Sequence, residues 1–268
     1  MASLPAKLIL SLLLLLGIAA APLKAQTLKP KPKKEFDYFT LSLSWSGTRC
    51  LNVKECCPTN GCCNPDIGSE FTIRGFWPDY NDGTWPACCN GTTFNENDEI
   101  APIMRHLERY WPSYYCTLSS ACGSPKGSIW AYEWVKHGTC ASPVLSTQYT
   151  YFSTVLLFYA TLDVTGTLSR SGYVASDSAE YPLEGITSAI KNAYRATPVV
   201  SCYGNAVKEV QLCFNKTLVP QDCPTTESGM LSKSSSGECP SIVTLPIKNV
   251  TPAPEKMNHL SFRGVLNS

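Results

Sequence analysis

The sequence has little histidine and almost no excess of charge. Three of its 268 residues are histidines, His106, His137 and His259, and the formal net charge at pH 7 is +1. A chain this close to neutral has no strong overall field to attract a nucleic acid or an anionic membrane. Any recognition of a polyanion must therefore come from a local cluster of cations.

The sequence also lacks the cysteine spacing of a zinc site. Its 14 cysteines do not form two CxxC pairs, and three adjacent pairs stand at positions 56–57, 62–63 and 88–89. An even number of cysteines in a secreted chain indicates up to seven disulfides. We therefore expect a disulfide-rich protein with neither a metal ion nor another cofactor.

No apolar run after the N-terminus is long enough to span a bilayer, so no membrane association is expected. Residues 1–25 have the basic, apolar and small-residue segments of a secretory signal peptide, and a signal anchor is the alternative. A Lys/Pro linker follows at 26–35, then a folded domain at 36–247 and a polar extension at 248–268. Glycosylation triplets begin at Asn90, Asn215 and Asn249, as suits the secretory pathway.

Strand and helix patterns are interspersed within residues 36–247. Alternation over 36–45 predicts a half-buried strand, and apolar runs predict strands at 70–77, 209–215 and 241–247. Helical spacing covers 95–111, 147–164 and 183–195. Because no regular βαβ units occur, the fold class is α+β, with a central antiparallel sheet flanked by several helices.

The segment "EWVKHGTC" places Glu133, Lys136 and His137 within five residues. In a helix, Glu133 and His137 share one face. An imidazole can move a proton near neutral pH, while a carboxylate orients it and an ammonium neutralises phosphate oxygens. The segment indicates phosphate chemistry, although an ordinary salt-bridged helix face has the same composition.

Several longer motifs make the sequence similar to the ribonuclease T2 family. They are "FDYFTLSLSW", "CC…GCC", "FTIRGFWPDYNDGTWPACC", "YWPS", "EWVKHGTC", "SGYVAS" and "CFNKTLVPQDCP". The resemblance runs from about residue 36 to 247 and is closest to the plant vacuolar, S-like branch. It implies cleavage of RNA by attack of the ribose 2′-OH on phosphorus, which leaves a 2′,3′-cyclic phosphate.

The resemblance also implies a role for individual residues. His137 would be the general base, and Glu133 and Lys136 would stabilise the phosphate in the transition state. Trp77 and Asp79 would hold a base by stacking and hydrogen bonding. The partner would be single-stranded RNA or a nucleotide, bound by a monomer.

Two departures from the family pattern affect catalysis. Arg74 stands where the family has its general-acid histidine, and Tyr132 stands where it has a phosphate-binding histidine. A guanidinium has a pKa above 12 and keeps its proton, but it can bind phosphate oxygens. Binding is therefore expected to survive where turnover is reduced, and neither His106 nor His259 is expected to replace the missing acid.

Three functions remain open at this point. The first is a catalytically impaired glycoprotein of the vacuole or the extracellular space, acting as a storage protein or as an RNA or nucleotide binder. The second is an active or weakly active endoribonuclease that uses His137. The third is a lectin-like or defence protein on the same scaffold, because a fold does not fix a function.

The family resemblance further implies some covalent features. Its disulfides suggest the pairs Cys202–Cys239, Cys213–Cys223 and Cys50–Cys56, with Cys140 joined to Cys88 or Cys89. The extension at 248–268 would be a vacuolar sorting propeptide, unless it is an unstructured tail. Ser44 and Ser46 flank Trp45 where the family usually carries Gln and Pro, so the family's nucleotide-site details do not carry over directly.

Overall fold

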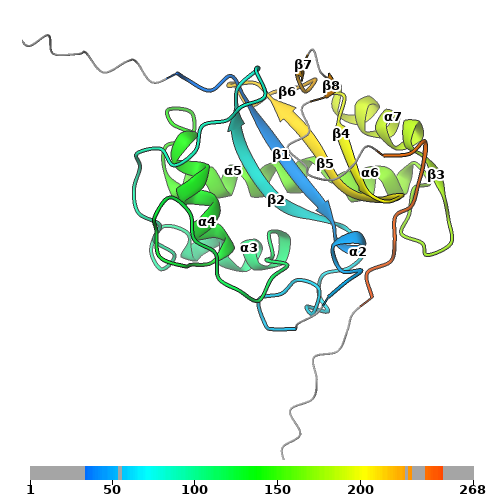
Figure 1. The fold of residues 1–268 in the computed structure, drawn as a ribbon, viewed down its shortest axis with the longest axis horizontal. Coiled ribbons are helices and arrows are strands. Elements are labelled where there is room, and N and C mark those ends of the chain that lie inside the picture. The colour runs from blue at the N-terminus through cyan, green and yellow to red at the C-terminus, as the bar shows by residue number, and fades with distance from the viewer. Residues whose placement is uncertain (1–33, 54–55, 227–228, 231–238, 250–268) are drawn as a thin grey trace, which may run out of the picture. The chain divides into compact units, whose positions relative to one another are not determined.

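The computed structural model describes residues 34–53, 56–226, 229–230 and 239–249, which include one compact unit that starts at Phe36 (Figure 1). The predicted signal peptide, most of the linker and the chain beyond Asn249 lie outside the described residues. Lys248, which the sequence assigns to the extension, is buried and donates from Nζ to the carbonyl oxygens of Asn64 and Ile67 at 2.7 Å each. The packed fold therefore continues past residue 247.

The main sheet is antiparallel, and its four longer strands lie in the order β2-β1-β5-β4 (Figure 1). These strands are β1 (Tyr38–Trp45), β2 (Phe71–Asp79), β4 (Val199–Tyr203) and β5 (Ala206–Phe214), and β6 (Pro220–Gln221) pairs with β5. Two short pairs join β3 (Tyr181–Pro182) to β9 (Ile242–Val243) and β7 (Thr225–Thr226) to β8 (Gly229–Met230). This architecture confirms the predicted α+β class.

Side chains cap the start of some of the helices. They are α2 (Ser46–Arg49), η1 (Ala101–Ile103), α3 (Met104–Tyr110), α4 (Ile129–Lys136), η2 (Gly138–Cys140), α5 (Gln148–Leu162), α6 (Val164–Arg170) and α7 (Leu183–Tyr194). Ser128 accepts a hydrogen bond from the backbone of Ala131 ahead of α4, and Thr147 forms a capping box with Thr150 ahead of α5. No helix in the described ranges has the length and apolar character needed to cross a membrane.

The helix predicted over residues 95–111 is shorter than expected. The α-helical turns start at Met104, after the 3-10 turn η1, and residues 95–99 precede them as loop and turn. Pro102 explains the late start, because proline disfavours a helical conformation of the residue before it and offers no backbone N–H. Asn95 instead accepts hydrogen bonds from the backbone of Asn97 and Asp98 in the preceding turn.

The strand β1 is fully buried, so the prediction of a half-buried strand is wrong. Its apolar side chains enter the core, where the ring of Phe39 stacks on Phe76 with centroids 4.7 Å apart. Its polar side chains are covered as well: Thr40 donates to Asp79 and Ser42 donates to Glu209. A strand in the middle of a sheet can bury hydroxyls when each has a hydrogen-bond partner.

Two strands each contain one extra residue, a β-bulge. Opposite β1, the register passes from Ile73 to Gly75 and leaves Arg74 as the bulged residue of β2. Opposite β4, it passes from Val207 to Glu209 and leaves Lys208 as the bulged residue of β5. A bulge redirects a side chain that regular alternation would send to the other face. Both extra residues are cations.

Seven disulfides join all 14 cysteines. The structure contains Cys202–Cys239 and Cys213–Cys223, and Cys140 is joined to Cys89. The predicted Cys50–Cys56 pair is wrong, because Cys50 follows α2 into the interior and meets the buried Cys62 there. The remaining pairs are Cys56–Cys63, Cys57–Cys116 and Cys88–Cys122.

The predicted glycosylation positions differ in accessibility. The side chains of Asn90 and Asn249 are exposed. Asn215 is half-buried, and its Oδ1 accepts hydrogen bonds from the backbone of Thr217 and Val219. We therefore expect Asn90 and Asn249 to be more accessible to glycosylation than Asn215, which stays a prediction for all three.

Candidate active site

The C-terminal end of α4 carries the predicted catalytic cluster. Glu133 is buried within the helix, and His137 ends it with the backbone N–H bonded to the Glu133 carbonyl. Two contacts hold this end: the Cys89–Cys140 disulfide, and a 3.0 Å hydrogen bond from the Cys88 backbone to the Lys136 carbonyl. The sequence motif thus places its imidazole and its carboxyl group on a fixed helix end.

The strand β2 brings Trp77 against this cluster. Its indole N–H donates to Glu133 Oε2 at 2.9 Å, and its ring lies 5.6 Å from the imidazole of His137. The guanidinium of Arg74 lies 5.4 Å from the same indole. A Cβ at Gly75 would come within 2.4 Å of the indole, so this close approach requires glycine. The two predicted signatures therefore meet at Trp77.

Burial raises the pKa of the Glu133 carboxyl to about 7, because the ionised form loses hydration. The hydrogen bond from Trp77 and the charges of Arg74 and Lys136 act in the opposite direction but are weaker. At acidic pH the group is therefore a neutral carboxyl. In that state it accepts the indole hydrogen bond but supplies no negative charge to an imidazolium.

Burial, together with the smaller effects of the Lys136 and Arg74 charges, lowers the pKa of His137 to about 3. Among the described residues its Nδ1 has no hydrogen-bond partner. The imidazole is therefore neutral above that pH and can accept a proton. This state suits a general base, and it does not suit a donor of the proton that a leaving oxygen needs.

Tyr132 contacts the lysine of the motif. The Lys136 ammonium donates to the phenol oxygen of Tyr132 at 2.7 Å. Tyr132 brings no positive charge of its own, and its hydroxyl directs the ammonium one helical turn back along α4. A phosphate at this position would meet one cation, Lys136, where the family pattern implies two.

Arg74 forms an ion pair that the sequence did not reveal. Its Nε donates to Glu209 Oε2 at 3.2 Å, and Glu209 is 3% exposed, whereas the Arg74 side chain is 43% exposed. Ser42 and Gln211 donate to the other oxygen of Glu209 at 2.5 and 2.7 Å. The buried carboxylate of Glu209 thus holds the Nε end of the Arg74 guanidinium. Its terminal nitrogens are the groups left for a phosphate.

Trp77 and Asp79, for which the resemblance implies contact with a base, are both buried, and that role stays a prediction. Asp79 is 1% exposed and accepts a 2.6 Å hydrogen bond from Thr40, so it cannot meet a base without leaving the sheet. Trp77 is 6% exposed, between Arg74 and His137. His106 lies exposed on α3, away from this packing.

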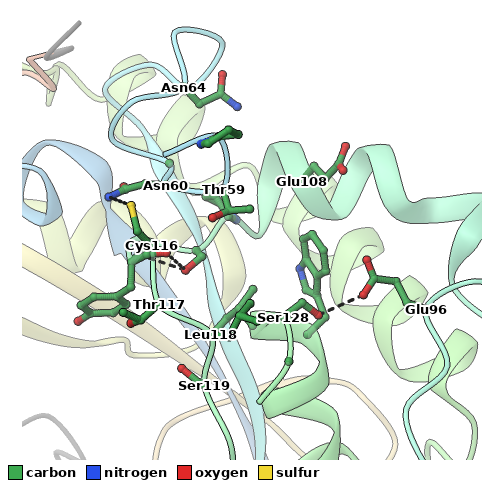
Figure 2. A pocket seen from close by; sticks show the side chains of 18 residues that line it. Thr59, Asn60, Asn64, Glu96, Glu108, Cys116, Thr117, Leu118, Ser119 and Ser128 are labelled. Atoms are coloured by element: carbon green, nitrogen blue, oxygen red, sulfur yellow. Dashed lines mark hydrogen bonds between the residues drawn. The ribbon is translucent and has the colours of Figure 1, made fainter. Parts of the chain in front are cut away.

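A separate cavity of about 400 Å³ lies beside the start of α4 (Figure 2). The cysteine-rich loop around Asn60, the segment around Leu118 and Ser128 line it, and Glu96 and Glu108 stand on its wall. None of the predicted catalytic residues lines this cavity. The cavity is therefore distinct from the cluster around Trp77. The two carboxylates on its wall also disfavour the binding of a phosphate there.

The fold is an antiparallel α+β domain with seven disulfides. One helix end carries an imidazole, a carboxyl and an ammonium group beside the strand that bears Trp77. Together these features have the form of a disulfide-stabilised nuclease. The profile of the Ribonuclease T2 family matches residues 36–223, and the chain belongs to that family.

Plant proteins are prominent among its relatives. The RNase-related protein from Calystegia sepium is 54% identical, with a TM-score of 0.73 over 81% of this chain and 100% of that one. Trichomaglin, described as a novel S-like ribonuclease, is 40% identical, with a TM-score of 0.72 over 80% of this chain and 100% of that one. Extracellular ribonuclease LE of Solanum lycopersicum is 32% identical over 75% of this chain and 86% of its own.

The raised pKa of Glu133 predicts a pH dependence of stability. Between the ordinary pKa near 4.5 and the folded value of about 7, the folded state holds a proton that the unfolded state releases. Raising the pH through this window therefore destabilises the folded protein. We expect Glu133→Gln, which mimics the neutral carboxyl, to gain free energy of unfolding relative to wild type by on the order of 2 kcal/mol between pH 4 and pH 8.

Urea denaturation of both proteins at the two pH values measures this difference. Glu108→Gln removes an exposed carboxylate from α3 and is the matched control, for which the difference should not change with pH. An equal effect of pH on Glu133→Gln and on wild type would show that Glu133 ionises normally in the folded protein.

Proposed function

We propose that this protein is a ribonuclease T2-like glycoprotein of the plant secretory pathway, vacuolar or extracellular, that binds single-stranded RNA or nucleotides and cleaves them poorly. The ion pair between Arg74 and the buried Glu209 carries the proposal. A permanently protonated group occupies the position of the general acid and is tied to the sheet. Storage of nitrogen fits such a protein, because seven cross-links favour persistence among proteases.

The proposal follows from the proton balance of the reaction. The 2′-OH loses a proton to a base as its oxygen bonds to phosphorus, and the P–O5′ bond breaks as the leaving oxygen gains a proton. His137 is neutral and can take the first proton. No second imidazole lies in the described cluster to give the other. General acid help is worth about 10²–10⁴ in rate, or roughly 3–5 kcal/mol.

A weakly active endoribonuclease is the second candidate. It is favoured by the retention of Glu133, Lys136 and His137 on one helix end. In that case water protonates the leaving oxygen, or His137 serves both steps. Cleavage would be slow, and it would disappear in His137→Ala.

Side-by-side cleavage of RNA at pH 5 tests the proposal. We expect the purified protein to cleave at least about 10²-fold more slowly than the tomato extracellular ribonuclease LE under the same conditions. Any remaining cleavage should be lost in His137→Ala, since cleavage that survives that change comes from a contaminant. A rate equal to that of the tomato enzyme would refute catalytic impairment.

A further inference from the structure

Three cations gather on the site face of the main sheet, around Glu209. Arg74 pairs with Glu209 directly, and the charges of Arg49 and Arg74 both act on the ammonium of Lys208. Tyr115 also acts on Lys208. These groups come from β2, β5, the end of α2 and a loop stapled by Cys57–Cys116. A nearly neutral chain needs a local cluster of cations to bind a polyanion. Arg49, Arg74 and Lys208 form such a cluster here.

The bulge in β5 is the reason that Lys208 belongs to this cluster. With regular alternation, Lys208 would point to the opposite face from Glu209. As the extra residue between the partners of Ser201 and Cys202, it is released from that alternation. The bulge in β2 releases Arg74 in the same way. Two independent irregularities of the sheet thus direct cations to one place.

Arg49 is held at the edge of the cluster by aromatic side chains. Its guanidinium lies 5.4 Å from the ring of Tyr114 and 5.7 Å from that of Tyr115, and it donates to the Tyr115 hydroxyl at 3.3 Å. These three residues line a cavity of about 370 Å³. Within the described residues Arg49 Nε has no hydrogen-bond partner and is buried. Among the residues that the structure describes, no carboxylate forms an ion pair with this guanidinium.

The charges of the cluster do not balance. Glu209 is the carboxylate that offsets Lys208, and it already accepts hydrogen bonds from Arg74, Ser42 and Gln211. Burial and the charge of Arg49 lower the pKa of Lys208, so a nearby anion would relieve the repulsion. Arg49 is half-buried in a hollow, where the phosphates of a flexible single strand can reach it and a flat anionic surface cannot.

We propose that Arg49 and Lys208 form a second phosphate-binding site, which holds a backbone phosphate of single-stranded RNA next to the one that meets Arg74. The inference rests on the proposed function and adds to it the region that binds the strand beyond the cleavage position. It predicts that oligonucleotides bind more tightly than dinucleotides, because a dinucleotide has one phosphodiester and fills only the site at Arg74.

Binding of 2′-O-methyl oligonucleotides tests this site, since they lack the 2′-OH and cannot be cleaved. Fluorescence anisotropy would compare a hexanucleotide with a dinucleotide on wild type, Lys208→Gln, Arg49→Gln and the control Lys191→Gln, an exposed lysine of α7. We expect both site variants to bind the hexanucleotide roughly 3- to 10-fold more weakly and to reduce its salt slope by about 0.7. Dinucleotide binding and the Lys191→Gln control should stay within about twofold of wild type.

The possible failures are distinguishable. If wild type binds both oligonucleotides but Lys208→Gln and Arg49→Gln behave like Lys191→Gln, the second site is refuted and the proposed function stands. If wild type binds neither oligonucleotide, the proposed RNA binding fails as well. Thermal melting of each variant checks its folding, and the two site variants lie on different elements, so a folding defect in one leaves the other informative.

Discussion

Replacing Arg74 and Tyr132 together with histidines should raise the rate of RNA cleavage by about 10²–10⁴. Arg74→His supplies a group that can give a proton to the leaving oxygen and be reprotonated by water. Tyr132→His restores the cation that the family pattern implies beside Glu133. Initial rates of cyclic-phosphate formation, followed between pH 4 and 7, measure the gain.

The surroundings of Arg74 favour this result. Glu209 would lie beside the new imidazole, still held by Ser42 and Gln211. A nearby carboxylate stabilises the imidazolium and raises its pKa, which keeps the acid protonated at mildly acidic pH. The neutral His137 would remain available as the base. In the double variant, the imidazole introduced at position 74 and that of His137 would therefore be in opposite protonation states.

Two matched variants separate the contributions. Arg74→Lys with Tyr132→His keeps a cation at position 74 without a titrating imidazole, and it should stay near the wild-type rate. Adding His137→Ala to the reverted protein should remove the gain. If the reverted protein is no faster than wild type, positions 74 and 132 do not limit its activity, and the buried Ser44 and Ser46 are the next positions to examine.

Glu209→Ala should lower the free energy of unfolding by about 3 kcal/mol or more. Ser42 and Gln211 would lose the acceptor that satisfies them in a buried position, at about 1–3 kcal/mol for each group. Arg74 contributes less, because it is 43% exposed and can turn to solvent. Chemical denaturation at pH 7 measures the loss.

Two comparisons test the cause of that loss. Glu180→Ala removes an exposed carboxylate and should change stability by less than about 0.5 kcal/mol. In Arg74→Ala with Glu209→Ala, the added cost of removing Arg74 should be smaller than in wild type, because Glu209 is no longer left unpaired. Additive costs would show that the two residues do not interact.

Much of the fold was predictable from local patterns. The periodicity placed β1, β2, α5 and α7 near their observed ranges, and the motif "EWVKHGTC" placed Glu133 and His137 on one helix end. The even number of cysteines indicated up to seven disulfides, but not that Cys50 meets Cys62. Pairing depends on which cysteines enter the interior together, and sequence spacing does not report that.

The decisive contact of the site was not predictable in the same way. Arg74 and Glu209 are 135 positions apart in the sequence. They meet because β2 and β5 pair with the two sides of the same strand, β1, so that their side chains can reach each other across it. One signal was present: Glu209 and Gln211 are polar residues inside an apolar run, two positions apart and thus on one face. The bulge at Lys208 left no mark in the pattern, because an extra residue shows only when the partner strand is known.

Because Arg74 is a bulged residue, the pairing of β2 with β1 does not depend on which side chain stands at position 74. Its neighbours Ile73 and Gly75 make the ladder contacts with β1. A different side chain at position 74 can therefore leave the sheet intact, and even deletion of the residue would join Ile73 to Gly75 in regular register, with the later side chains of β2 on their present faces. Because the ladder between β1 and β2 does not depend on this residue, a nuclease scaffold can lose or regain a proton donor here without being rebuilt.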